Sequence, residues 1–261
     1  MSAIEHALTT LDPISLQATN QLAELQTRVD RKYLVDEATL VQLITAVAPS
    51  VRVLQIDGRQ SSLYRSTYFD TESLELFRAA VQGRRHRYKI RSRTYGETGP
   101  CFLEVKAKGR RGHNVKARIP YRRTDHAAIT SEGDDFVEQA TGAQGLAAAL
   151  RPTLCTEYVR STLIDPGTRT RLTLDRGLQC TDLAVDDCNE AMLDAIVIET
   201  KTTGPPSAAD RWLWEHHRRP TSISKYCTGL AATRPELPAN KWHTLIARHW
   251  RTPSTPSLGI T

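Results

Sequence analysis

The sequence predicts an α+β fold, in which an antiparallel β-barrel or tunnel has helices packed on its outside. Three observations lead to this prediction. Strand-like runs follow one another between residues 28 and 202, turn residues separate these runs, and helical patterns are confined to two insertions and the end of the chain. With 261 residues, of which 39% are hydrophobic and 25% charged, the chain is long and apolar enough to bury a sizeable core.

The first half of the chain is expected to alternate one helix with several strands. Residues 1–27 form a partly helical lead-in, and a strand follows at 28–35. Asp36 is a favourable N-cap for a helix that ends before Pro49. Further strands are predicted at 62–70, 86–95, 101–108 and 114–121.

The second half repeats this alternation and ends in helices. A helical pattern covers 125–150, and strands are predicted at 155–163, 168–175, 178–185 and 193–202. Helices are predicted at 207–217, 223–232 and 240–250, before a Pro/Ser-rich tail at 252–261. We therefore expect one main domain over 28–235, with a C-terminal helix and flexible tail at 236–261.

Composition argues against several classes of protein. No run approaches eighteen apolar residues, so no membrane-spanning helix is expected. The segment from Met1 to Leu11 lacks the basic cluster and apolar run of a secretory signal. The five cysteines have no CxxC spacing, which favours reduced thiols over a zinc site or a disulfide framework. A cytoplasmic location is therefore expected.

Positive charge is concentrated in one segment. Residues 84–123 hold fourteen Lys and Arg against two acids, a net charge of +12, whereas the rest of the chain holds 21 basic and 27 acidic residues, a net charge of −6. Such clustering inside an otherwise acidic chain indicates an anionic ligand. A nucleic acid is not expected, because few aromatic residues are interleaved with the basic ones.

Charged residues alternate with apolar ones along seven predicted strands. They are Asp30 and Lys32; Arg87, Lys89, Arg91 and Arg93; Glu104, Lys106 and Lys108; Lys116 and Arg118; Arg160; Arg169, Arg171 and Asp175; and Glu199 and Lys201. For any single strand, a solvent-exposed face explains the pattern. In a barrel covered by helices, however, the charged faces of all the strands point inward. Because unpaired buried cations are costly, such a tunnel suits a polyanion, and Arg and Lys suit phosphate oxygens.

Carboxylates among these cations suggest a divalent metal ion. Mg²⁺ and Mn²⁺ take carboxylate, phosphate and water oxygens as ligands, so Glu199, Glu104 and Asp30 are candidate ligands. The alternative for each is a salt bridge to the lysine two residues further along its strand.

Short motifs along residues 28–232 resemble the VTC domain, the polyphosphate-polymerase branch of the triphosphate tunnel metalloenzymes. They occur in the order DRKYLV (30–35), YRSTYFDT (64–71), RSRTYG (91–96), FLEVK (102–106), YVR (158–160), RLTLD (171–175), IETK (198–201) and SKY (224–226). Asp30 departs from the family's usual Glu at the first motif. The resemblance implies a triphosphate tunnel fold over 28–235.

The resemblance also implies roles for single residues. The implied catalytic set is Lys32, Arg91, Arg93, Lys106, Arg160, Arg171 and Lys225, and Ser224 is implied to bind phosphate with them. Lys89 and Arg118 are added to the phosphate-binding set because they share the charged strand faces. Glu199 is the implied ligand for Mn²⁺ or Mg²⁺, with Glu104 as a weaker candidate.

The function implied is transfer of the γ-phosphoryl group of ATP to a growing polyphosphate chain inside the basic tunnel. Two alternatives remain open, namely hydrolysis of triphosphate or polyphosphate in the same tunnel and binding of polyphosphate without catalysis. ATP and polyphosphate, or another triphosphate, are the expected partners, and the sequence gives no prediction of the oligomeric state.

Overall fold

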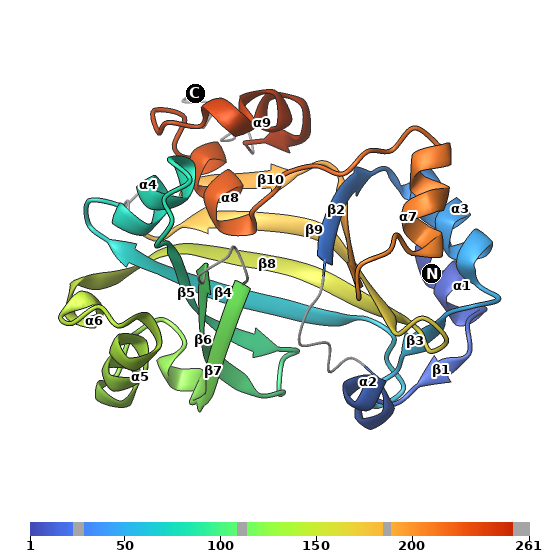
Figure 1. Ribbon diagram of the computed structural model, residues 1–261, viewed down its shortest axis with the longest axis horizontal. Helices are drawn as coiled ribbons and strands as arrows, with labels where there is room; N and C mark the ends of the chain where they lie inside the picture. The colour runs from blue at the N-terminus through green and yellow to red at the C-terminus, as the bar shows by residue number, and fades with distance from the viewer. Residues whose placement is uncertain (23–28, 109–113, 185–188, 253–261) are drawn as a thin grey trace, which may run out of the picture. The chain divides into compact units, whose positions relative to one another are not determined.

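The computed structural model describes residues 1–22, 29–108, 114–184 and 189–252 (Figure 1). The chain divides into two compact units. Unit 1 comprises Met1–Leu63, Tyr158–Leu178 and Ala195–Ile223, and unit 2 comprises Tyr64–Glu157, Gln179–Asp194 and Ser224–Thr261. Strands β8 (Leu150–Asp165) and β9 (Thr170–Asp182) are long enough to contribute to both units.

The strands of unit 1 follow the hydrogen-bonded order β2–β11–β9–β8–β3–β1. The strands not yet introduced are β1 (Pro13–Ile14), β2 (Val29–Val35), β3 (Arg52–Leu54) and β11 (Ile196–Thr202). The pairs β2–β11, β11–β9 and β3–β8 are antiparallel, whereas β1 and β3 are parallel. Helices α1 (Ala3–Thr9), α2 (Leu16–Leu22), α3 (Glu37–Val47) and α7 (Ala208–Glu215) belong to the same unit.

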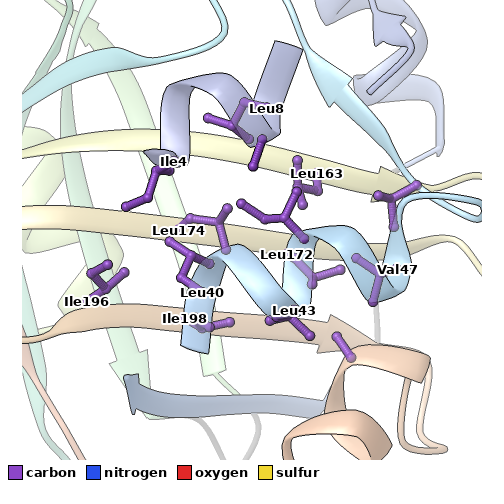
Figure 2. Packing of buried hydrophobic residues seen from close by; sticks show 14 of the residues in the cluster. Ile4, Leu8, Leu40, Leu43, Val47, Leu163, Leu172, Leu174, Ile196 and Ile198 are labelled. Carbon is purple, nitrogen blue, oxygen red and sulfur yellow. The ribbon is translucent and has the colours of Figure 1, made fainter. Parts of the chain in front are cut away.

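One face of the unit 1 sheet packs against helices. Figure 2 shows Leu40 and Leu43 of α3 with Leu172, Leu174 and Ile198 of the strands, all of them buried. Side chains of a strand alternate between its faces, so the residues next to these in β9 and β11 lie on the opposite face. Helix α3 begins where expected, because the Asp36 side chain accepts a hydrogen bond from the Thr39 backbone N–H.

The strands of unit 2 follow the order β12–β10–β9–β8–β4–β5–β6–β7. The strands not yet introduced are β4 (Ser62–Thr71), β5 (Tyr88–Tyr95), β6 (Cys101–Lys108), β7 (Asn114–Tyr121), β10 (Glu190–Leu193) and β12 (Trp250–Arg251). The meander from β4 to β7 is antiparallel throughout. Helices of this unit are α4 (Glu75–Val81), α5 (Ser131–Thr141), α6 (Leu146–Ala149), α8 (Lys225–Thr233) and α9 (His243–His249), with 3₁₀ turns at Arg123–Asp125 and Asn240–Trp242.

A separate core lies on one face of the β4–β7 meander. Ile90, Leu103 and Val105 are buried there, together with Val137 of α5 and Ala147 of α6. By strand alternation, the residues flanking Ile90, Leu103 and Val105 point away from this core. The unit therefore has an apolar face and a second face that carries its charged residues.

The α+β fold built on antiparallel strands is confirmed, and so are most predicted elements. Three expectations were wrong. The strands predicted at 168–175 and 178–185 are the single strand β9, in which Gly177 has a positive φ of 60° that glycine adopts without strain. The helix predicted over 125–150 is divided by Gly142 and Gly145, both with positive φ, and ends before β8 begins at Leu150. The strand predicted at 193–202 begins at Ile196 and is preceded by the separate strand β10.

The elements that the sequence did not predict are all short, namely β1, β3, α4, β10 and β12. Residues 23–28, 109–113, 185–188 and 253–261 lie outside the described part, so the predicted tail and parts of the lead-in are not tested. The domain boundaries proposed at 27/28 and 235/236 stay a prediction. Among the described helices, each is too short or too polar to cross a membrane.

Candidate functional site

The strand register of unit 1 places its charged residues on the face opposite the core. Glu199 lies across from Lys32 of β2 and Lys201 lies across from Asp30. On its other side Lys201 lies across from Arg171 of β9. This face, which we call the charged face of unit 1, consists of Asp30, Lys32, Arg160, Arg171, Asp175, Glu199 and Lys201.

Ion pairs organise this face. Arg160 donates to Asp175 through two hydrogen bonds, of 2.6 Å from Nε and 2.7 Å from Nη2, and Asp175 is fully buried. Glu199 forms an ion pair with Lys201, and 15% and 14% of the two side chains are exposed. Lys32 Nζ donates to the Ile223 carbonyl at 2.8 Å. The face therefore holds cations in fixed positions beside buried carboxylates.

Electrostatics keep Glu199 ionised. Burial alone would raise the pKa of Glu199, but the positive charges of Lys201, Lys32 and Arg160 hold it well below the usual range. Burial lowers the pKa of Lys201, and the negative charges of Glu199 and Asp30 oppose that shift. Glu199 is thus a carboxylate at neutral pH, which is the form that binds a metal ion.

Unit 2 has a charged face of its own, set by the same alternation. Arg91 lies across from Tyr68 of β4 and Glu104 of β6, and Lys89 lies across from Lys106. The charged face of unit 2 consists of Lys89, Arg91, Arg93, Glu104, Lys106, Lys116 and Arg118. It has six cations and one carboxylate, whereas the face of unit 1 has four cations and three carboxylates. The excess of positive charge therefore lies mainly on unit 2.

Glu104 is the buried centre of the unit 2 face, with 2% of its side chain exposed. Its Oε2 accepts a 2.8 Å hydrogen bond from Arg91 Nε, and its Oε1 accepts one of 2.5 Å from Lys116 Nζ. Burial raises the pKa of Glu104, but Arg91, Arg93 and Lys116 lower it well below its usual range. Burial lowers the pKa of Lys116 to about 8 despite the opposing charge of Glu104.

The start of helix α8 joins this face. Lys89 Nζ donates to Ser224 Oγ at 2.8 Å, and Ser224 also caps α8 by accepting from the Cys227 N–H. Lys225, the first residue of α8, lies close enough to Tyr68 to lower its pKa. The proposed phosphate ligands Ser224 and Lys225 are therefore brought to the same face as Lys89.

The other predicted ligands of unit 2 also lie on its charged face. Arg93 donates to Ser66 Oγ at 3.0 Å and is buried. Arg118 stacks over the Phe102 ring at 4.7 Å and is exposed, as is Lys106. The predicted cations of the strands thus lie on the charged faces, with Lys32, Arg160 and Arg171 in unit 1 and Lys89, Arg91, Arg93, Lys106 and Arg118 in unit 2.

The three candidate metal ligands differ in how well they fit a metal ion. Both oxygens of Glu104 already accept hydrogen bonds from Arg91 and Lys116, so a metal ion there would have to displace two cations. Glu199 and Asp30 lie on adjacent strands of one face, and their carboxylate oxygens are the donors that Mg²⁺ and Mn²⁺ prefer. Two carboxylates on one face therefore fit a divalent ion better than Glu104 alone does. A metal ion at Glu199 would have to displace Lys201 from its ion pair with that carboxylate.

The ion pair of Glu199 with Lys201 is the alternative that the sequence already offered for Glu199. Sequence reasoning did not assign a role to Asp175, Lys116 or Tyr68. The strand alternation already put Asp175 and Lys116 on the charged faces, and only their partners were missing. The Tyr68 hydroxyl accepts a hydrogen bond from Arg91, which no feature of the sequence indicates.

The comparisons with known proteins cover the part of the chain that carries both charged faces. The model of the VTC domain family matches residues 27–234. A protein from Hippeastrum, described as a candidate adenylyl cyclase with a dominant triphosphatase activity, is similar in structure, with a TM-score of 0.50 and 18% identity over 82% of this chain and 98% of that one. A candidate adenylate cyclase from Vibrio parahaemolyticus has a TM-score of 0.44 and 14% identity over 76% of this chain and 95% of that one. No curated protein sequence matches the chain significantly. At these identities the Hippeastrum structure supports the fold alone.

Proposed function

Because the chain belongs to the VTC domain family of the triphosphate tunnel metalloenzymes, we propose that it transfers the γ-phosphoryl group of ATP to a growing polyphosphate chain. The observation that supports this proposal is the pair of charged faces. Cations that are fixed by buried carboxylates, as Arg91 and Arg160 are, bind an anion with little loss of side-chain freedom.

Phosphoryl transfer mainly requires positioning and neutralisation of charge. A terminal oxygen of the polyphosphate chain attacks the γ-phosphorus, the bond from that phosphorus to the β–γ bridging oxygen breaks, and ADP leaves. The acceptor oxygen is already ionised, so no nucleophilic side chain is needed. Lys89, Arg91 and Arg93 would hold phosphate oxygens on unit 2, and Lys32, Arg160 and Arg171 would do so on unit 1.

Glu199, with Asp30 beside it, would hold the divalent ion. When bound, Mn²⁺ or Mg²⁺ neutralises charge that develops on the phosphate oxygens. The contribution of the chain itself is to keep Glu199 ionised through Lys32, Lys201 and Arg160. We propose that Lys201 then turns from Glu199 towards the phosphate.

Hydrolysis of a triphosphate is the second candidate function, because water can take the place of the chain terminus without any change of residues. The triphosphatase activity in the description of the Hippeastrum protein supports hydrolysis as the alternative reaction. The two reactions differ in product, since transfer lengthens a polyphosphate and leaves ADP, whereas hydrolysis releases orthophosphate.

The test is to incubate the purified chain with ATP and Mn²⁺ or Mg²⁺ and to resolve the products by ³¹P NMR. Polyphosphate resonances that grow with ADP support the polymerase. Orthophosphate with ADP supports the hydrolase, and unchanged ATP together with tight polyphosphate binding supports a binding protein.

Two variants test the separate roles of a metal ligand and a phosphate ligand. Glu199→Gln is expected to abolish turnover while polyphosphate binding survives, because the amide keeps the size of the side chain but removes the charge that a metal needs. Arg91→Ala is expected to weaken both. Arg151→Ala is the matched control, because Arg151 is exposed and donates to the backbone carbonyls of residues 148 and 150. Full activity of Glu199→Gln would overturn the metal assignment.

A further inference from the structure

The side chain of Arg91 is held from both sides. Its Nε donates to Glu104 at 2.8 Å and its Nη2 lies 2.7 Å from the same oxygen, while its Nη1 donates to the Tyr68 hydroxyl at 2.9 Å. Glu104 and Tyr68 are both buried, on the strands to either side of β5. A guanidinium that is fixed at both ends of its fork keeps one orientation.

Tyr68 is itself fixed by an aromatic partner. Its ring stacks on that of Tyr226, with centroids 5.0 Å apart and planes 21° from parallel. Tyr226 donates its hydroxyl proton to Asp70 Oδ2, which also accepts a 2.8 Å hydrogen bond from the Phe77 N–H, and Asp70 Oδ1 accepts one of 2.9 Å from the Leu76 N–H. Tyr226 and Asp70 are buried, so this set of contacts is shielded from water and rigid.

The contacts connect two elements that carry proposed phosphate ligands. Arg91 lies on strand β5, whereas Tyr226 follows Lys225 at the start of helix α8. Tyr68 touches both, and the positive charges of Arg91, Arg93 and Lys225 oppose the effect of burial and lower the pKa of its phenol. The acceptor role of the Tyr68 oxygen is shown by its 2.9 Å hydrogen bond from Arg91 Nη1.

We propose that Tyr68 is a positioning residue, which holds the Arg91 guanidinium in place beside Lys225 for binding phosphate. Its effect is exerted through Arg91, and it does not touch the ligand. The proposal rests on the proposed function for the identity of the ligand, but the fixed orientation of Arg91 is a property of the protein alone.

The first test therefore needs no ligand. Rotation about the Cζ–Nη bonds of Arg91 is measured by ¹⁵N NMR, with the Arg91 signal assigned by its absence in Arg91→Lys. In the unsubstituted chain we expect slow rotation and separate Nη signals at low temperature. In Tyr68→Phe, which keeps the ring stack but loses the hydroxyl, we expect faster rotation and merged signals.

The second test measures tripolyphosphate binding by calorimetry in a double-mutant cycle. Tyr68→Phe is expected to weaken binding about three- to tenfold, the worth of one hydrogen bond. In the Arg91→Ala background the same substitution is expected to change nothing, since Tyr68 acts through Arg91. Tyr88→Phe is the matched control. Tyr88 lies on strand β5, as Arg91 does, but its hydroxyl donates to the Thr141 carbonyl on the opposite face of that strand. It should leave the Arg91 signals and the affinity unchanged.

The outcomes separate the two proposals. If the unsubstituted chain does not bind tripolyphosphate, the proposed function fails, while the NMR measurement still decides whether Tyr68 fixes Arg91. If the chain binds but Tyr68→Phe leaves rotation and affinity unchanged, the role of Tyr68 is refuted. An equal loss of affinity in both backgrounds would also refute it, because the effect would then not pass through Arg91.

Discussion

The buried pair Arg160–Asp175 can be disrupted in a way that reports on anion binding. Asp175 is fully buried and Arg160 is 12% exposed, so Asp175→Ala leaves a buried cation without its carboxylate. Removing one partner of such a pair costs about 3–5 kcal/mol. For a chain of this size, about 2–4 °C of melting temperature is lost per kcal/mol, so we expect a decrease of roughly 6–20 °C.

A second pair of nearly the same geometry provides the control. Arg234 forms a bidentate pair with Asp182, which is fully buried, and Arg234 is 15% exposed. Asp182→Ala should therefore destabilise the protein by a similar amount. Arg234 ends helix α8 and lies on neither charged face, so it is not expected to bind phosphate.

The assay compares the melting temperatures of both variants with and without tripolyphosphate. Ligand at a hundred times its dissociation constant stabilises a folded protein by about 2.7 kcal/mol. In Asp175→Ala a phosphate oxygen can take the place of the lost carboxylate, and a hydrogen bond to a charged group adds about 1.5–3 kcal/mol. The ligand should thus raise the melting temperature of Asp175→Ala more than that of Asp182→Ala or the unsubstituted chain. Equal increases in all three would refute the reasoning that Arg160 binds phosphate.

Three further predictions concern protonation. The pKa of Tyr33 is raised by burial and by Asp210, so the free energy of unfolding should fall as pH rises above 10, and Tyr33→Phe should reduce that fall in an alkaline denaturation series. The pKa of Glu104 lies below 4.5 in the folded state, so the stability that Glu104 contributes is present above pH 4.5 and is lost as the pH falls below it. Glu104→Gln should therefore reduce the pH dependence of the free energy of unfolding in urea between about pH 6 and 3. Lys116 has a pKa of about 8, and a bound polyanion raises it, so binding of tripolyphosphate at pH 8 should take up protons. Calorimetry in buffers of different ionisation enthalpy measures this proton uptake, and Lys116→Met should remove it.

Strand alternation is the part of the site that sequence predicts best. The parity of Lys89, Arg91 and Arg93 fixes their common face once β5 is recognised, and the charged residues of β9 and β11 follow in the same way. Which residue pairs with which depends on the strand register, and register is set by tertiary packing. The contacts of Arg160 with Asp175 therefore could not be read from the sequence.

Tertiary contacts also decide the role of Tyr68. Its neighbour Tyr226 is more than 150 residues away in the chain, and the stack between them exists only in the folded protein. Short elements such as α4, with seven residues, are missed for a related reason, since their stability comes from packing rather than from local sequence.

Titration of tripolyphosphate into variants of the charged face of unit 2 tests the central claim most directly. Arg91→Ala removes a fixed cation from that face, and Arg151→Ala is the control. If the face binds the phosphate chain, Arg91→Ala should weaken the affinity measured by calorimetry at low salt by about 1.5–3 kcal/mol, the range for a hydrogen bond to a charged group, whereas Arg151→Ala should not. The loss should shrink as salt is added. An affinity that Arg91→Ala leaves unchanged would contradict the claim that the charged face of unit 2 binds phosphate.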